Sequence, residues 1–214
     1  MSEAREILAQ APVVPVLTIE DPLNAVPLAR ALVEGGLPVL EVTLRTEAGL
    51  AAIAAIARDV PGAIVGAGTV RGADDYAAAC AAGSQFIVSP GLTDTLLHAA
   101  ASHAVPLIPG VATVSEMMHA LDNGIDCLKF FPAEASGGAA TLKSFYGPFP
   151  DVSFCPTGGV GLHNIADYLA VPSVITVGGT WLTPASLLQA EDWEAIAGLA
   201  REAATTVSRL RGEQ

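Results

Sequence analysis

The chain is poor in charge, and most of the charge that it has is negative. Only 15% of its 214 residues are charged, and 10 Lys and Arg residues stand against 22 Asp and Glu residues, for a formal net charge of −12. A field of that sign repels nucleic acid and anionic membranes, so we expect neither as a partner. It also opposes an anionic ligand, which local cations or backbone N–H groups would have to hold.

Cysteine is scarce, and a metal-binding pattern is missing. Cys80, Cys127 and Cys155 are spaced too widely for a disulfide framework or a zinc knuckle, and no histidine is spaced to share a metal with a neighbouring carboxylate. We therefore expect no metal or other cofactor, and a location in the reducing cytoplasm. Residues 1–5 lead into no signal-like apolar segment, which agrees with that expectation.

One long stretch of the chain has no charge at all. Residues 168–190 contain no Asp, Glu, Lys or Arg, and their number alone is compatible with a membrane span. Pro172, Gly178, Gly179 and Pro184 interrupt the stretch, so it is predicted to be a helix end, a buried strand and a loop.

What the chain does have is a regular alternation of short apolar strands and Ala-rich amphipathic helices. The predicted strands begin near Val13, Val39, Ala63, Phe86, Pro106, Cys127, Ser153 and Val174. Helices are predicted between them, for example over 24–34, 49–58 and 94–103, and a helix over 192–211 closes the chain. Eight βα units predict an α/β fold, a single-domain (β/α)8 TIM barrel over residues 1–214. The alternative is an open doubly wound sheet, but no Gly-x-Gly-x-x-Gly fingerprint follows the first strand.

Lysine occurs only twice in the sequence. Lys129 lies within an apolar strand, whereas Lys143 is predicted to lie on a helix surface. Lysine is almost never fully buried without a partner, and burial favours its neutral, nucleophilic amine. The alternative is a lysine that snorkels from an edge strand, but a closed barrel has no edge. We therefore interpret Lys129 as a reactive amine.

The second predicted strand carries polar residues on one face. Glu41, Thr43 and Arg45 alternate with apolar residues, so they are predicted to point into the barrel. One interpretation is a structural Glu41–Arg45 ion pair, because interior charges are costly unless they are paired or used. We favour a functional role, since barrel sites lie at the carboxyl ends of strands. Glu41 would act as general acid and base, and Arg45 would hold a carboxylate.

Glycine pairs follow the last two predicted strands. They are Gly158-Gly159 and Gly178-Gly179. Barrel enzymes often bind phosphate with the loops after strands seven and eight, where glycine lets backbone N–H groups approach the oxyanion. The alternative is that the glycines only make tight turns, but two pairs at the two expected places favour a phosphate site.

These segments resemble a known family when they are taken together and in order. They are EVTLRT (41–46), VGAGTV (65–70), VSPG (88–91), LIPG (107–110), KFFPAE (129–134), CPTGG (155–159) and GGTWL (178–182). The set resembles the 2-keto-3-deoxy-6-phosphogluconate (KDPG) aldolase / 4-hydroxy-2-oxoglutarate aldolase family, over about residues 12–207. The resemblance implies a class I, Schiff-base aldolase of the Entner–Doudoroff pathway, which releases pyruvate and glyceraldehyde 3-phosphate, needs no metal and is a homotrimer.

The resemblance also implies roles for single residues. They are Lys129 as the Schiff-base amine, Glu41 as the acid and base, Arg45 and Thr69 at the pyruvate carboxylate, Pro90 and Phe131 as walls around the keto end, Thr157 at the substrate chain, and Gly158, Gly159, Gly178, Gly179 and Thr180 near the phosphate. Thr180 stands where the family pattern has Ser and keeps the hydroxyl. The hydroxyl of Thr157 favours the gluconate-derived substrate over its phosphogalactonate epimer.

Four alternatives stay open from the sequence. Two keep the Schiff base and change the substrate to 4-hydroxy-2-oxoglutarate or to the phosphogalactonate epimer. A third is a phosphosugar isomerase barrel with Lys129 as a general acid, and a fourth is a noncatalytic barrel that binds a phosphorylated ligand. Trapping by borohydride in the presence of pyruvate distinguishes an imine from the last two.

Overall fold

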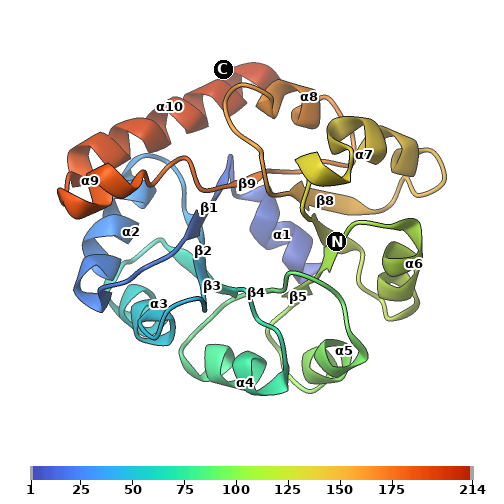
Figure 1. Cartoon of the computed structure of the whole chain (residues 1–214), viewed down its shortest axis with the longest axis horizontal. Helices are drawn as coiled ribbons and strands as arrows, with labels where there is room; N and C mark the ends of the chain where they lie inside the picture. Colours follow the sequence, from blue (N-terminus) through green and yellow to red (C-terminus); the bar gives the residue numbers. More distant parts are fainter. Residues whose placement is uncertain (1, 213–214) are drawn as a thin grey trace.

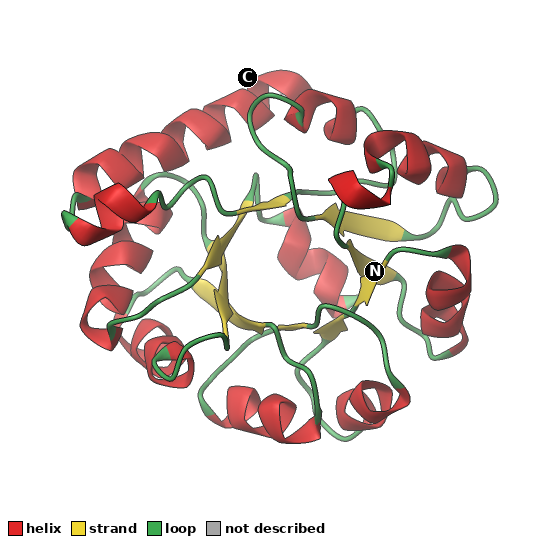
Figure 2. Ribbon diagram, viewed as in Figure 1, coloured by secondary structure: helices red, strands yellow, loops and turns green. Residues whose placement is uncertain are grey.

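The computed structural model describes residues 2–212 and shows parallel strands that curl around a common centre, with helices outside them (Figures 1 and 2). The strands are β1 (Val14–Leu17), β2 (Val39–Thr43), β3 (Ile64–Gly68), β4 (Ile87–Val88), β5 (Leu107–Ile108), β6 (Gly110–Val111), β7 (Cys127–Phe130), β8 (Ser153–Pro156) and β9 (Gly178–Gly179). The α-helices are α1 (Glu3–Ala9), α2 (Ala25–Glu34), α3 (Gly49–Asp59), α4 (Ala73–Ala81), α5 (Asp94–Ala101), α6 (Val114–Asp122), α7 (Gly138–Tyr146), α8 (Ile165–Leu169), α9 (Ala185–Gln189) and α10 (Trp193–Arg211). Two 3-10 helices, η1 (Pro22–Asn24) and η2 (Glu134–Ser136), complete the elements.

All strand pairs are parallel and fall into two sheets. One has the order β5-β4-β3-β2-β1-β9, and the other has the order β6-β7-β8. Residues of β1, β2, β7 and β8 are buried throughout, as expected for strands with the interior on one face and helices on the other. The predicted α/β class is therefore confirmed as a curled parallel sheet with helices around it.

The predicted strand positions agree with the structure except at two places. Pro109 has no N–H to donate and separates β5 from β6, so the fifth predicted strand is split. The eighth was predicted to begin near Val174, which forms only an isolated bridge with Phe154, and regular pairing begins at Gly178. Residues 168–190 contain the end of α8, β9 and the short α9, and no helix within residues 2–212 is long and apolar enough to cross a membrane.

Helix α1 has no counterpart among the predicted elements, and it shapes the interior. Ala4, Ile7 and Leu8 of α1 are buried in a core that includes Val39 and Cys127, the first residues of β2 and β7. Figure 1 shows α1 within the ring of strands in this view. A second, larger core lies between the sheets and the outer helices. The apolar side chains around α1 therefore form one layer of the interior, at the amino ends of the strands.

Candidate active site

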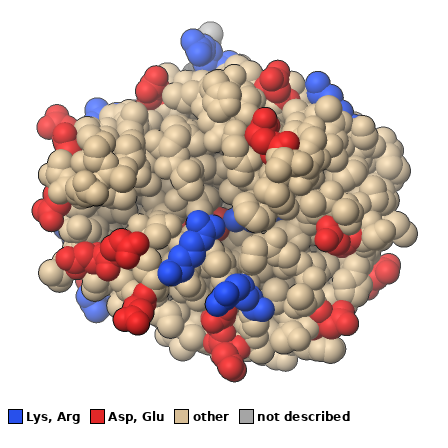
Figure 3. Space-filling model, viewed as in Figure 1, with Lys and Arg blue, Asp and Glu red and all other residues tan. Residues whose placement is uncertain are grey.

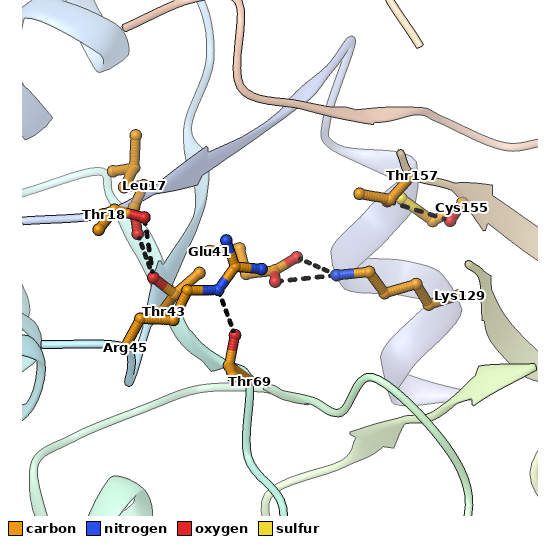
Figure 4. A network of polar contacts seen from close by, with 9 residues as sticks. All are labelled: Leu17, Thr18, Glu41, Thr43, Arg45, Thr69, Lys129, Cys155 and Thr157. Carbon is orange, nitrogen blue, oxygen red and sulfur yellow. Dashed lines mark hydrogen bonds and ion pairs between the residues drawn. The ribbon is translucent and has the colours of Figure 1, made fainter. Parts of the chain in front are cut away.

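The next layer of the interior is charged. Lys129 lies two residues after Cys127, and Glu41 lies two residues after Val39. Because side chains alternate along a strand, both point to the same face of their strands as that apolar layer. The Nζ atom of Lys129 lies 3.0 Å from Oε1 and 3.3 Å from Oε2 of Glu41. The side chains are 7% and 4% exposed. Figure 4 shows the two side chains pointing toward each other from opposite strands, so the predicted amine and carboxylate do meet.

A glycine makes room for the Glu41 carboxylate. A side-chain Cβ at Gly68, the last residue of β3, would lie 2.2 Å from Oε1 of Glu41. Gly66, which also lies in β3, is the register partner of Glu41 in β2. Because no side chain larger than hydrogen fits at Gly68 without moving Glu41, the sequence of β3 fixes where the carboxylate lies.

The position of Arg45 differs from the prediction. Strand β2 ends at Thr43, so Arg45 lies beyond the strand and is exposed. Its Nε donates to Oγ1 of Thr69 over 3.2 Å. The alternative of a Glu41–Arg45 ion pair is wrong, because the ion pair of Glu41 in the described part of the chain is with Lys129. Arg45 and Thr69 are nevertheless neighbours, as their joint role at a carboxylate requires (Figure 4).

Thr69 has an unusual backbone conformation. Its φ is +61°, in the left-handed region that a β-branched residue rarely adopts. Such strain persists only where the surrounding structure holds it, and it is typical of functional sites. Thr69 follows Gly68 directly, so one short turn carries both the glycine next to Glu41 and the hydroxyl that accepts from Arg45.

Two further groups lie close to Lys129. Its Nζ lies 5.4 Å from the centre of the Phe131 ring, which is half-buried. Pro90, the other residue predicted to line the keto end, is exposed on the loop after β4. Cys155 is the register partner of Lys129 on β8. Burial raises the pKa of the Cys155 thiol to about 12, although the Lys129 charge acts in the opposite direction. Cys155 is therefore a protonated thiol at neutral pH and no rival nucleophile.

One glycine pair, Gly158-Gly159, follows β8, and the other, Gly178-Gly179, forms β9 itself. Thr157 is buried and bridges to Gly178. A Cβ at Gly178 would lie 2.3 Å from Oγ1 of Thr157, and a Cβ at Gly179 would lie 1.7 Å from the Trp181 ring. Close packing alone therefore requires glycine at both positions, whether or not the pair also contacts a phosphate.

The other glycine pair is required by its backbone. Gly158 and Gly159 have φ values of +101° and +79°, which glycine adopts at no steric cost. They lie on the loop that follows β8, and Gly159 is exposed. Thr180, which follows β9, is exposed as well. The structure thus brings the two predicted glycine segments together through the Thr157–Gly178 bridge and leaves the hydroxyl of Thr180 accessible.

The charge distribution agrees with an anionic ligand at the centre of one face. In the view of Figure 3, most acidic side chains lie around the periphery, whereas basic side chains lie both at the edge and near the middle, over the ring of strands seen in Figure 2. Local cations can offset a net charge of −12 in this way. Among residues 2–212, no group of three or more His, Cys, Asp or Glu side chains is placed to hold a metal ion.

Comparisons with known proteins give a consistent family. A family model described as "Aldolase: KDPG and KHG aldolase" matches residues 4–199. The 2-dehydro-3-deoxy-phosphogluconate aldolase of Dickeya dadantii is 54% identical over 202 residues, which cover 94% of this chain and 95% of that protein. The KHG/KDPG aldolase of Escherichia coli K12 has the same identity and coverage.

Solved structures agree with the sequence relatives. The KDPG aldolase of Legionella pneumophila, with pyruvate captured as a covalent carbinolamine, is 42% identical with a TM-score of 0.92 and covers 94% of this chain and 98% of that chain. The KDPG aldolase of Zymomonas mobilis with 3-phosphoglycerate is 48% identical with a TM-score of 0.91, over 95% and 96% of the two chains. The chain therefore belongs to the KDPG and KHG aldolase family.

Proposed function

We propose that the chain is a class I aldolase that cleaves KDPG to pyruvate and glyceraldehyde 3-phosphate through a Schiff base on Lys129. The observation that carries this proposal is the buried amine of Lys129, 3.0 Å from the carboxylate of Glu41. The relatives support it, because several are named for this activity and the Legionella enzyme holds pyruvate as a covalent carbinolamine.

The first half of the reaction uses the amine as a nucleophile. Lys129 adds to the C2 ketone, and loss of water from the resulting carbinolamine gives an iminium ion. Glu41 is within hydrogen-bond distance of the amine, so it takes the proton that Lys129 loses and returns one to the departing hydroxyl. Burial keeps bulk water away from both groups.

The second half uses the iminium as an electron sink. The C3–C4 bond breaks as a base removes the proton of the C4 hydroxyl, and glyceraldehyde 3-phosphate leaves. The enamine that remains on Lys129 is protonated at C3 and then hydrolysed to pyruvate. Glu41 is the carboxylate hydrogen-bonded to the Lys129 amine, so we assign it the proton transfers in both halves.

The remaining residues orient the substrate. Arg45 and Thr69, already neighbours, hold the pyruvate carboxylate, and the Phe131 ring and Pro90 line the keto end. The Thr157 hydroxyl donates to the Cys155 carbonyl over a long 3.5 Å, and a substrate chain can replace this weak contact. The glycines after β8 and in β9, together with Thr180, hold the phosphate through N–H groups and a hydroxyl.

We also propose a fuller architecture. Residues 1–214 form one domain, and its curled sheets are an eight-stranded (β/α)8 barrel in which β5 and β6 act as one strand. Two isolated bridges support it, since they join β8 to residue Val174 and the loop after β8 to Gly178. We extend the proposal to a homotrimer, as the family resemblance implies, and to the cytoplasm, where the free thiols of Cys80, Cys127 and Cys155 stay reduced.

A second candidate substrate is 4-hydroxy-2-oxoglutarate. The relative from Escherichia coli is named KHG/KDPG aldolase, and the Lys129–Glu41 pair serves either substrate. The phosphogalactonate epimer is less favoured, because the similar structure described as native KDPGal is only 27% identical.

The deciding experiment is steady-state cleavage of KDPG, its C4 epimer and 4-hydroxy-2-oxoglutarate by the same enzyme preparation. We expect the largest kcat/KM for KDPG, because 4-hydroxy-2-oxoglutarate has no phosphate for the glycine segments and the Thr157 hydroxyl favours KDPG over its C4 epimer. A larger kcat/KM for either alternative would reassign the physiological substrate and leave the Schiff base intact.

A further inference from the structure

We propose that Glu134 and Tyr168 form a clasp that positions the phosphate-binding loop 157–161, and that this clasp sets affinity for the phosphorylated end of the substrate alone. The inference rests on the proposed function, because it takes Gly158 and Gly159 to lie at the phosphate. Both clasp residues are outside the group that touches the keto end.

The backbone at Glu134 already holds the loop from one side. The N–H of Ala133 donates to the Thr157 carbonyl over 2.8 Å, and the N–H of Glu134 donates to the Gly158 carbonyl over 3.0 Å. These two hydrogen bonds continue the pairing of β7 with β8 beyond the ends of the strands. The segment that carries Lys129 is thereby joined to the glycine loop.

The side chain of Glu134 lies directly on the second glycine. A Cβ at Gly159 would lie 2.5 Å from Cγ and 2.8 Å from Cβ of Glu134, so the two residues are in close contact. Asn164 holds the same loop, because its Nδ2 donates to the Gly159 carbonyl over 3.1 Å and its Oδ1 accepts from the Gly161 N–H over 2.9 Å. The left-handed Gly159 is thus held by a contact with Glu134 and by a hydrogen bond from Asn164.

The carboxylate of Glu134 needs an anchor of its own, because a free carboxylate next to this loop would repel a phosphate. Tyr168 supplies it: the ring is buried on α8, and the hydroxyl donates to Oε1 of Glu134. Burial and the neighbouring Glu134 raise the pKa of the Tyr168 hydroxyl, which keeps it a donor at neutral pH. The hydrogen bond directs the negative charge toward α8 and holds the side chain across Gly159.

A matched pair of tyrosine substitutions tests the clasp. Tyr168→Phe removes the anchor, and Tyr76→Phe removes an equally buried hydroxyl that donates to the Val105 carbonyl, away from the loop. Two quantities are measured for each: KM for KDPG, and the pyruvate concentration that half-saturates inactivation by borohydride. Pyruvate has no phosphate, so it reports the keto end only.

We expect Tyr168→Phe to raise KM for KDPG about tenfold, as the loss of one hydrogen bond to a charged group predicts. The half-saturating pyruvate concentration stays at the wild-type value, and Tyr76→Phe changes neither quantity. Glu134→Ala, at an exposed position, should also raise KM for KDPG and leave the half-saturating pyruvate concentration unchanged. It tests the clasp if Tyr168→Phe fails to fold. Glu134→Gln keeps the acceptor and the contact with Gly159, so it stays close to wild type.

Three results would overturn the clasp. The first is an unchanged KM for KDPG in Tyr168→Phe or Glu134→Ala, and the second is an equal rise in KM for KDPG and in the half-saturating pyruvate concentration. The third is a rise in KM for KDPG alone in the control Tyr76→Phe. Failure of the proposed function is a separate observation, because it shows as wild-type enzyme that does not cleave KDPG at all.

Discussion

The two ends of the proposed substrate site are built in different ways. At the keto end, the buried side chains of Lys129 and Glu41 meet from opposite sides of the interior. At the phosphate end, glycines offer backbone N–H groups, and bulkier residues such as Trp181 and Glu134 pack against them from behind. In the proposed function, the first end supplies chemistry through two groups, and the second supplies affinity through several small contacts. Substitutions at the keto end should therefore lower kcat, and those at the phosphate end should raise KM.

The largest effect is expected from Lys129→Ala. Without the amine no imine forms, so kcat/KM should fall by a factor on the order of 10⁴ or more in a steady-state cleavage assay. Lys143→Ala, at the other lysine, is the control and should retain full activity, since Lys143 is exposed on α7. Lys129→Ala also leaves the buried Glu41 carboxylate without its partner. This should lower the free energy of unfolding by about 3 to 5 kcal/mol, so the folding of Lys129→Ala is checked by circular dichroism.

Glu41→Gln should have the next largest effect. The amide keeps the shape of the side chain but transfers no proton, so we expect kcat to fall by about 10² to 10⁴ while pyruvate still binds. The pyruvate dependence of borohydride inactivation measures binding separately from turnover. Wild-type kcat in this variant would remove Glu41 from the proton transfers.

Gly68→Ala tests whether the carboxylate must stay where the structure has it. The added Cβ would lie 2.2 Å from Oε1 of Glu41, so the carboxylate has to move, and a shift of about 1 Å lowers kcat by about 10². Gly72→Ala is the matched control, because nothing lies within 4 Å of a Cβ there. Equal kcat values for the two variants would show that the position of Glu41 is not critical.

Thr180→Val should have the smallest effect and should act on the other end. Valine keeps the shape and loses the hydroxyl, so we expect KM for KDPG to rise about three- to tenfold, with kcat and pyruvate binding unchanged. A fall in kcat of the same size would blur the distinction between the two ends, and an unchanged KM would take Thr180 out of the phosphate site.

The sequence predicts that Lys129 and Glu41 are buried in the interior, and the reason is local periodicity. Alternation along β2 and an apolar segment around Lys129 are enough to expect an inward Glu41 and a buried amine. The exact end of a strand is harder to predict, so Arg45 was placed in the interior although β2 ends two residues earlier.

Contacts between distant segments were beyond prediction from one sequence. The approach of Gly68 to Glu41 depends on the register between β2 and β3, and the hydrogen bond from Tyr168 to Glu134 spans 34 residues. The register could have drawn attention to Gly68, since parallel neighbours bring small residues next to large inward ones. Helix α1 is a 7-residue helix, too short for its periodicity to stand out, and most of its stability comes from packing against the strands.

The central claim is that one particular amine of two forms the imine. The enzyme is incubated with pyruvate and borohydride, digested, and its peptides are identified by mass spectrometry. We predict a pyruvate adduct on Lys129, none on Lys143, and none on either lysine when pyruvate is omitted. An adduct on Lys143, or an unmodified Lys129 in enzyme that cleaves KDPG at full rate, would contradict the account.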